Sequence, residues 1–209
     1  MQKHNNTINI DEHPKLSLIL ATELFQSGKI FIYPTDTIYG IGGNPFDKNV
    51  VSRISSIKGR EEKKQFIWLI SDIDNLLNYV ELNYENQLDF LQKIWPGPVS
   101  VVLNVNERTK KVTDLQTIAV RIPNNNFCQM LLKEIKLPLI STSVNRSSQS
   151  PINELEKIMQ DFGKDVDAII YHNALIQAYS STILDLTEEK PKLIREGSIK
   201  FVELLKNFD

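Results

Sequence analysis

Cysteine is almost absent from the chain, because Cys128 is the single one in 209 residues. One cysteine excludes a disulfide framework and any zinc site of the CxxC type. Cys128 lies in the segment FCQMLL, whose apolar pattern predicts a helix, so we expect it to pack in the core. A lone packed thiol also fits a reducing compartment, and we expect the protein to be cytoplasmic.

Several sequence signatures of enzymes are missing. The chain contains neither a GxxxxGK[ST] P-loop nor a GxSxG elbow, and its GIGGNP segment is not the GxGxxG dinucleotide fingerprint. The three histidines, His4, His13 and His172, show no paired spacing, so we expect no protein-held metal. The mode of catalysis that remains is positioning of substrates and neutralisation of charge, which suits nucleotidyl transfer.

Long apolar runs and an excess of one charge are missing as well. No run approaches the ~20 apolar residues that span a bilayer, and the first 15 residues lack the apolar core of a signal peptide. We therefore expect no membrane association. Lys and Arg number 24 against 26 Asp and Glu, a net charge of −2. Any site for an anion must therefore come from a local group of basic residues.

The apolar patterning predicts a single α/β domain at residues 15–209, preceded by an N-terminal arm at 1–14. Helices are expected at 15–27, closed by Gly28, and at 47–58, capped by Asp47 and ended by Gly59. Strands and helices do not alternate strictly, which favours a twisted, mixed sheet flanked by helices. Strands are expected at 29–33, 65–70, 99–105, 117–123, 137–145 running into a polar loop, 168–172, 181–186 and 192–195, and further helices near 72–80, 84–94, 126–135, 152–162 and 198–208.

Polar side chains gather where four of the predicted strands end, at residues 34–37, 117–121, 141–145 and 180–182. The helix at 47–58 also ends in a basic segment, KGREEKK. Hydroxyl groups beside Arg and Lys suit phosphate oxygens, and the glycines of YGIGG permit a close approach of the backbone or a turn. Each cluster alone is more simply explained by a turn or a solvated face. Together they favour a phosphate or nucleotide site.

Motifs that follow one another in the chain resemble those of the YrdC/TsaC family, the L-threonylcarbamoyl-adenylate synthases. The matching segments are YPTDTIYGIGG, KGREEKK, WPGPVSVVL, TIAVRIP, STSVNRSS and the closing SSTILDLT and LIREGSI, within about residues 15–200. The resemblance implies a twisted sheet around a concave, basic site. It implies synthesis of L-threonylcarbamoyl-AMP from L-threonine, bicarbonate and ATP, with release of pyrophosphate and with Mg²⁺ carried by the ATP. The product would serve a complex that modifies the tRNA adenosine beside the anticodon.

Position within these motifs implies a role for individual residues. Threonine would be held by Thr35, Arg121, Ser141 and Ser181. ATP would be held by Lys58, Arg60, Lys64, Thr117, Ser143 and Arg195. The catalytic cluster around the phosphates would comprise Lys58, Arg60, Ser143 and Asn145. The chain resembles the short, single-domain form of the family.

The residues that depart from the family pattern include Asn124, Val144 and Ser148, and Ser100 stands in place of threonine in the WPGP segment. Ser148 stands where relatives have glycine, so we expect a backbone conformation there without positive φ. Two alternatives stay open. One is a non-catalytic or differently specific relative that binds nucleotide. The other is a module that binds RNA, double-stranded RNA included, although the aromatic residues needed for base stacking lie mainly in apolar runs.

Overall fold

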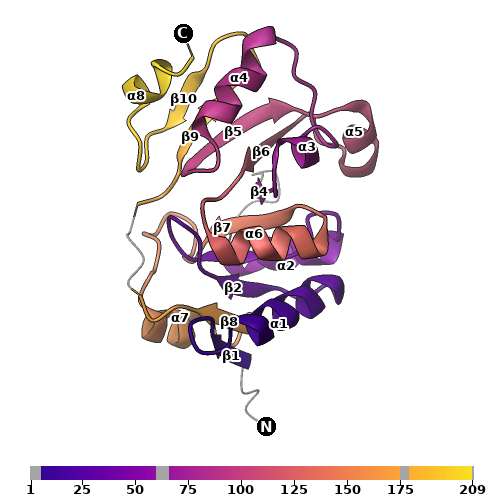
Figure 1. Ribbon diagram of the computed structural model, residues 1–209. Helices are drawn as coiled ribbons and strands as arrows, with labels where there is room; N and C mark the ends of the chain where they lie inside the picture. The colour runs from indigo at the N-terminus through magenta and orange to yellow at the C-terminus, as the bar shows by residue number, and fades with distance from the viewer. Residues whose placement is uncertain (1–5, 60–65, 175–178, 209) are drawn as a thin grey trace.

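The computed structural model of the chain describes residues 6–59, 66–174 and 179–208. Its strands form one mixed sheet of ten in the order β1-β8-β2-β3-β7-β4-β6-β5-β9-β10, which runs from the N-terminal to the C-terminal end of the molecule (Figure 1). The strands are β1 (Asn6–Asn9), β2 (Phe31–Tyr33), β3 (Gly40–Gly42), β4 (Ile67–Leu69), β5 (Val99–Asn104), β6 (Thr117–Arg121), β7 (Leu139–Ser143), β8 (Ala168–Tyr171), β9 (Thr182–Asp185) and β10 (Lys192–Arg195). Parallel and antiparallel pairs are mixed, for example β4 with β6 and β4 with β7, which confirms the predicted fold class.

The helices begin and end largely where the sequence predicts. They are α1 (Pro14–Gln26), α2 (Lys48–Lys58), α3 (Ile73–Leu76), α4 (Glu85–Ile94), α5 (Glu107–Thr113), α6 (Asn126–Ile135), α7 (Leu155–Phe162) and α8 (Phe201–Leu205). The Asp47 carboxylate accepts hydrogen bonds from the backbone N–H groups of Asn49 and Val50, and Gly59 ends α2 with a φ of 58°. The predicted cap and stop of this helix are therefore confirmed.

Alternation along the central strands gives the sheet two distinct faces. Ile67 lies opposite both Ala119 and Ser141, so these three side chains share one face, which we call the site face. Helices α1 and α6 cover part of the site face through a cluster that includes Phe31 and Leu139. On the opposite face, α2 and α7 pack on one part of the sheet, and α3, α4 and α8 pack on another.

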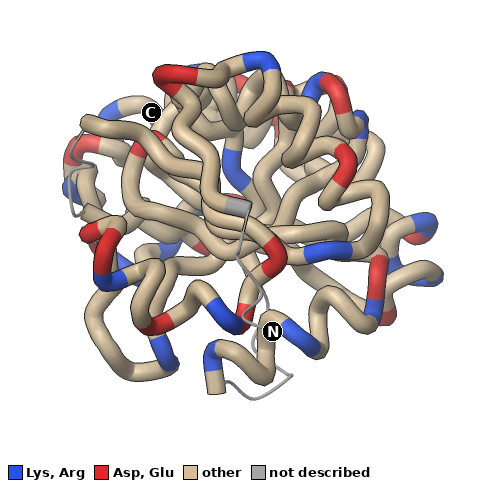
Figure 2. Tube along the Cα trace, turned by 90° about the horizontal axis from the view of Figure 1, so that it is seen from below, with Lys and Arg blue, Asp and Glu red and all other residues tan. Residues whose placement is uncertain are grey.

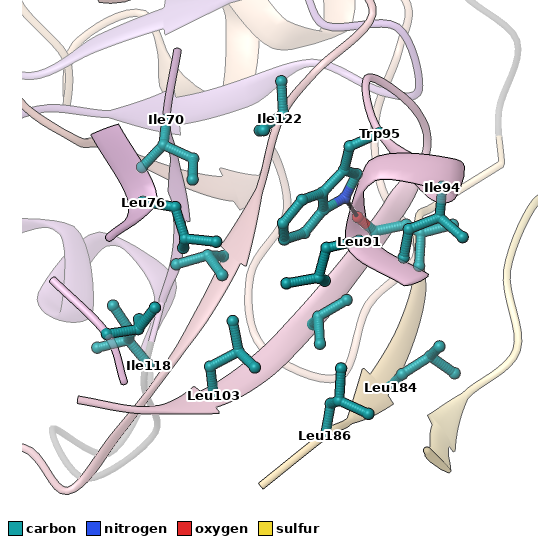
Figure 3. Close-up of a cluster of buried hydrophobic side chains, with 14 of the residues drawn as sticks. Ile70, Leu76, Leu91, Ile94, Trp95, Leu103, Ile118, Ile122, Leu184 and Leu186 are labelled. Carbon is teal, nitrogen blue, oxygen red and sulfur yellow. Dashed lines mark hydrogen bonds between the residues drawn. The ribbon is translucent and has the colours of Figure 1, made fainter. Parts of the chain in front are cut away.

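The second of these covered parts is the largest apolar cluster and lies near the C-terminal end of the molecule. Figure 3 shows Trp95 among its members, with Leu91 and Ile122 beside the indole ring. The indole Nε1–H donates to the carbonyl of Val99 at 2.6 Å, so the one polar atom of this buried ring has a partner. The peptide bond from Trp95 to Pro96 is cis.

Three elements were not expected from the sequence. Part of the predicted N-terminal arm forms β1, which pairs in parallel with β8, although the division of the chain at residue 14 stays a prediction. Residues 40–42 form β3 rather than the predicted turn, and pair with β2 and β7. Helix α5 has a mostly polar sequence, ERTKKVT, and begins at an Asn106 side chain that accepts from the backbone N–H of Thr109.

Cys128 is fully buried in α6, as predicted. Its thiol lies 3.3 Å from the carbonyl oxygen of Pro34, and burial raises the pKa of the thiol far above its ordinary value. None of the helices in the described part of the chain is long and apolar enough to cross a lipid bilayer.

Candidate functional site

A cavity of 180 Å³ lies on the site face, where β4, β6, β7 and β9 meet the loop that follows β2. Its floor is apolar and includes Ile67 and Ala119, which alternation places on this face. Its walls carry hydroxyl and guanidinium groups from segments far apart in the sequence. Six of the predicted site residues line it: Thr35, Arg121, Ser141, Ser143, Ser181 and Arg195.

The loop after β2 is fastened by the Thr35 hydroxyl. Oγ1 donates to the carbonyl of Ile38 at 2.7 Å and accepts from the backbone N–H of Thr37 at 3.1 Å. Thr35 is 5% exposed, so these bonds hold a buried turn of the chain. The side chain thus lines the cavity while its hydroxyl mainly shapes the loop.

Arg121 joins this loop to β6. Its Nε donates to the carbonyl of Gly97 at 3.1 Å, its Nη1 donates to Thr37 Oγ1 at 2.9 Å, and its Nη2 pairs with the Asp36 carboxylate. Burial lowers the pKa of Arg121, and the Asp36 charge opposes that shift. Among the described residues these bonds occupy three of the five guanidinium donors, so two N–H groups remain for a ligand carboxylate.

The place of Asp36 and Thr37 in the strand-end cluster, beside Thr35, predicts that one of them holds the loop. Both contact Arg121, and this partner was not predicted. The second carboxylate oxygen of Asp36, Oδ2, is buried and has no hydrogen-bond partner in the described structure. The Asp36 charge is therefore compensated mainly through Arg121, and the two residues act as one buried unit.

A second group of polar atoms joins the end of α2 to the end of β7. Lys58 is 3% exposed, and its Nζ donates to the Ser143 carbonyl at 2.5 Å and to Asn145 Oδ1 at 2.6 Å. Ser143 Oγ also donates to Asn145 Oδ1, at 2.5 Å. The motifs KGR and STSVN, 85 residues apart at Lys58 and Ser143, therefore meet in one hydrogen-bonded cluster beside the cavity.

Backbone geometry holds this cluster in place. Gly59 turns the chain away immediately after Lys58, and the Lys58 carbonyl accepts from the backbone N–H of Ser147 at 2.7 Å. Ser148 has a φ of 66°, so the expectation that this serine avoids positive φ is wrong. A non-glycine residue in this region carries a modest strain, which the bond to α2 offsets together with the bond from Asn145 Nδ2 to the Gln149 carbonyl.

The far wall of the cavity comes from β9 and β10. Ser181 Oγ lies 2.9 Å from Ser100 Oγ, and the Ser181 carbonyl accepts from Nη2 of Arg195 at 2.9 Å. Ser100 is fully buried, and sequence reasoning noted it only as a variation of the WPGP segment. Its role here is to orient Ser181. Arg195 is an exposed residue that lines the cavity, and its guanidinium is held there by the bond to the Ser181 carbonyl.

The remaining predicted residues are placed less directly. Thr117 begins β6 and, by alternation, shares the face of Ala119 and Arg121, but it does not line the cavity. Arg60 and Lys64 lie outside the described residues.

Carboxylates and other metal ligands are scarce at the cavity. No Asp or Glu of the described chain lines it, and Asp36 is paired with Arg121. No group of three or more His, Cys, Asp or Glu in the described residues is arranged to hold an ion. This donor set does not fit a divalent cation held by the protein, and it fits an anion better.

Sequence comparison assigns the family. A profile of the Sua5/YciO/YrdC family, described as "Telomere recombination", matches residues 23–197. The chain belongs to the Sua5/YciO/YrdC family. A curated relative, the threonylcarbamoyl-AMP synthase of Pyrococcus abyssi, is 30% identical over 202 residues, which cover 95% of this chain and 59% of the relative.

Solved structures agree with this membership. The crystal structure of Pyrococcus abyssi Sua5 complexed with L-threonine has a TM-score of 0.84 at 29% identity, covering 97% of this chain and 59% of that one. Escherichia coli YciO has a TM-score of 0.81 at 26% identity, covering 91% of this chain and 92% of YciO. The chain thus spans about three fifths of Pyrococcus Sua5 but matches nearly all of YciO.

Proposed function

We propose that the chain is a transferase that makes L-threonylcarbamoyl-AMP from L-threonine, bicarbonate and ATP, with release of pyrophosphate. The observation that carries the proposal is the cluster of Lys58, Ser143 and Asn145 beside a cavity lined by Arg121. One part of this arrangement suits phosphate oxygens and the other suits an amino-acid carboxylate. A Pyrococcus Sua5 with which the chain shares 29% identity has been crystallised with L-threonine, which supports the second half.

The size of the cavity supports a division of the site between threonine and the nucleotide. At 180 Å³ it lies below the roughly 300–1,000 Å³ of pockets that enclose drug-sized ligands. We therefore place threonine inside it, against the two N–H groups of Arg121 that have no partner among the described residues and the hydroxyls of Ser141 and Ser181, with Thr35 shaping the wall. The nucleotide would lie across the mouth, with its phosphates at Lys58, Ser143 and Asn145. Arg195 and Thr117 would approach it, as would Arg60 and Lys64.

The reaction then needs two steps. The threonine amine attacks bicarbonate, and loss of water leaves an N-carboxylate on threonine. An oxygen of that carboxylate attacks the α-phosphorus of ATP, and the bond to pyrophosphate breaks. Both partners in the second step are anions, so cationic groups that neutralise charge as they approach lower the barrier most. Lys58, Arg60 and Arg195 would supply that charge, and Mg²⁺ would arrive as part of the nucleotide rather than on protein ligands.

The product is a reactive mixed anhydride, so another catalyst must consume it. We propose that it is passed to a complex that transfers the threonylcarbamoyl group to the tRNA adenosine beside the anticodon, in keeping with the family resemblance. Cytoplasmic location follows from the same proposal.

Release of pyrophosphate tests the proposal. The purified chain, incubated with ATP and Mg²⁺, should release pyrophosphate only when threonine and bicarbonate are both present, and mass spectrometry should detect threonylcarbamoyl-AMP. Ser143→Ala should strongly reduce the rate, whereas Ser56→Ala on the exposed side of α2 should not. Release that does not depend on threonine, or no release at all, would contradict the proposed reaction.

Two alternative functions predict a different result, namely no release of pyrophosphate. A relative that binds nucleotide without catalysis would retain ATP binding and release no pyrophosphate; the match to nearly all of YciO is the reason to include it. An RNA-binding module would bind RNA and would release no pyrophosphate from ATP. Lys and Arg alternate with Asp and Glu around the molecule in the view of Figure 2, and this does not favour a large basic surface for RNA.

A further inference from the structure

A second cavity, of 610 Å³, lies on the opposite face of the strands that form the candidate site. Trp68 of β4, Ile118 of β6 and Ile140 of β7 line it, whereas an adjacent residue in each of these strands lines the candidate site, namely Ile67, Ala119 and Ser141. One layer of backbone therefore separates the two cavities. Nothing in the proposed reaction uses the second one.

The second cavity exists because two helical layers leave part of the sheet uncovered. Helices α2 and α7 pack over Ile140 and its neighbours, and α3, α4 and α8 pack over Trp68 and Ile118. Between them the sheet is bordered by the first half of α2 and by the end of α5, where Val112 is 59% exposed. A volume of 610 Å³ falls within the roughly 300–1,000 Å³ of small-molecule sites.

The lining is aromatic on one side and carries a single charge. Phe46, Phe66 and Trp68 all contribute, and the rings of Phe46 and Trp68 meet edge to face with centroids 5.3 Å apart. Such walls favour a flat, apolar ligand. Lys48 is the one charged residue of the described chain that lines the cavity, and no acidic residue does. The backbone N–H groups at the start of α2 are already capped by Asp47, so Lys48 is the group available to an anion.

We propose that this cavity is a second ligand site, which takes a small aromatic molecule carrying one anionic group such as a carboxylate or sulfonate. The ring system would lie against the aromatic wall formed by Phe46 and Trp68, and the anion would lie at the rim beside the Lys48 ammonium. The proposal does not depend on the threonine and ATP reaction, because Phe46, Trp68 and Lys48 do not line the candidate site, although Phe66 lines both cavities.

The fluorescent aromatic sulfonate 1-anilinonaphthalene-8-sulfonate tests the position of the site. Fluorescence of the probe should rise on addition of the folded wild-type protein and should saturate. Val51→Trp fills the cavity from α2, and it should raise the dissociation constant about tenfold or more, a loss of about 1.4 kcal/mol or more. Ser52 also lines the cavity but is exposed, so Ser52→Trp should fill the cavity with less risk to folding. It should raise the dissociation constant of the probe in the same way, and it replaces Val51→Trp as the test if that variant does not fold.

Ile183→Trp is the matched control, because Ile183 lines the candidate site and not the second cavity. It should leave the dissociation constant of the probe unchanged. If Ile183→Trp abolishes binding, or if neither tryptophan on α2 weakens it, the probe binds elsewhere and the proposal is wrong. Absence of binding to wild type also overturns it.

Charge is tested with Lys48→Gln. Because an exposed ion pair contributes up to about 1 kcal/mol, this variant should raise the dissociation constant of the sulfonate up to about fivefold. Lys133→Gln, on α6 away from the cavity, is the control and should have no effect. The uncharged analogue N-phenyl-1-naphthylamine should bind wild type and Lys48→Gln equally. Equal losses for both probes would show that Lys48 does not select an anion.

Discussion

Asp36→Asn tests the buried ion pair beneath the candidate site. Arg121 is 4% exposed and the Asp36 side chain 11% exposed, so both charges lie largely away from water. The substitution keeps the shape of the side chain but leaves the guanidinium without a countercharge. Removing one partner of a buried pair costs about 3–5 kcal/mol of folding free energy. Burial already lowers the pKa of Arg121, and loss of the Asp36 charge would lower it further.

That cost is large enough to measure by thermal unfolding. For a domain of this size 1 kcal/mol shifts Tm by roughly 2–4 °C, so Asp36→Asn should lower Tm by about 6–20 °C. Circular dichroism during heating gives Tm, and urea titration gives the free energy of unfolding.

The control is Asp89→Asn, which removes the same charge from an exposed pair. The Asp89 carboxylate lies 2.8 Å from Lys93 Nζ, and the two side chains are 68% and 43% exposed. Surface pairs of this kind contribute at most about 1 kcal/mol, so this Tm should fall by less than about 4 °C. Equal shifts in the two variants would mean that burial does not strengthen the Arg121–Asp36 pair, and the reasoning would be refuted.

Three further predictions concern other contacts. Gly42→Ala should fail to fold or lose more than about 3 kcal/mol, because its added Cβ would lie 2.2 Å from the Ile140 carbonyl oxygen; a stability within about 1 kcal/mol of wild type would contradict this. Asp11 has a lowered pKa, caused by the Asn173 backbone N–H and then by His172, so it stabilises the fold above its ordinary pKa and less as pH falls; Asp11→Asn should therefore lower Tm more at about pH 6 than at about pH 3, and an equal loss at both would count against it. Thr35→Val leaves the Ile38 carbonyl and the Thr37 N–H without their partner and loosens the loop that lines the cavity, so it should weaken threonine binding about tenfold to a hundredfold with little change for ATP, measured by calorimetry. The reverse pattern would move Thr35 to the nucleotide half.

Local signals in the sequence predicted much of the fold. Asp47 and Gly59 marked the two ends of α2, because a carboxylate satisfies exposed N–H groups and glycine accepts the left-handed conformation at little cost. The β-branched and apolar run VSVVLN likewise predicted β5. These features act within a few residues, so they can be recognised without knowing where the rest of the chain lies.

The elements that were missed depend on contacts between distant segments. Residues 40–42 include two glycines, which have low strand propensity, and they form β3 because a larger residue does not fit on the face of Gly42: a Cβ there would meet the Tyr33 ring as well as the Ile140 carbonyl. Strand β1 forms because Ile8 and Ile10 are buried against α1 and β8, in a segment that reads as polar. Neither cause is visible in the local pattern.

The two cavities also depend on contacts between distant segments, so the sequence predicts them only in part. Motif resemblance named residues of the candidate site, but the pairing of Arg121 with Asp36 and of Ser181 with Ser100 came only from the fold. The second cavity has no motif at all. It arises because the two helical layers leave the central strands uncovered beside Trp68, where the exposed Val112 of α5 borders the opening. Strands β4, β6 and β7 contribute residues to both cavities, so a ligand that shifts these strands from one side also shifts the lining of the other cavity. The fluorescence of Trp68 on β4 should therefore change when a ligand binds on either side of the sheet.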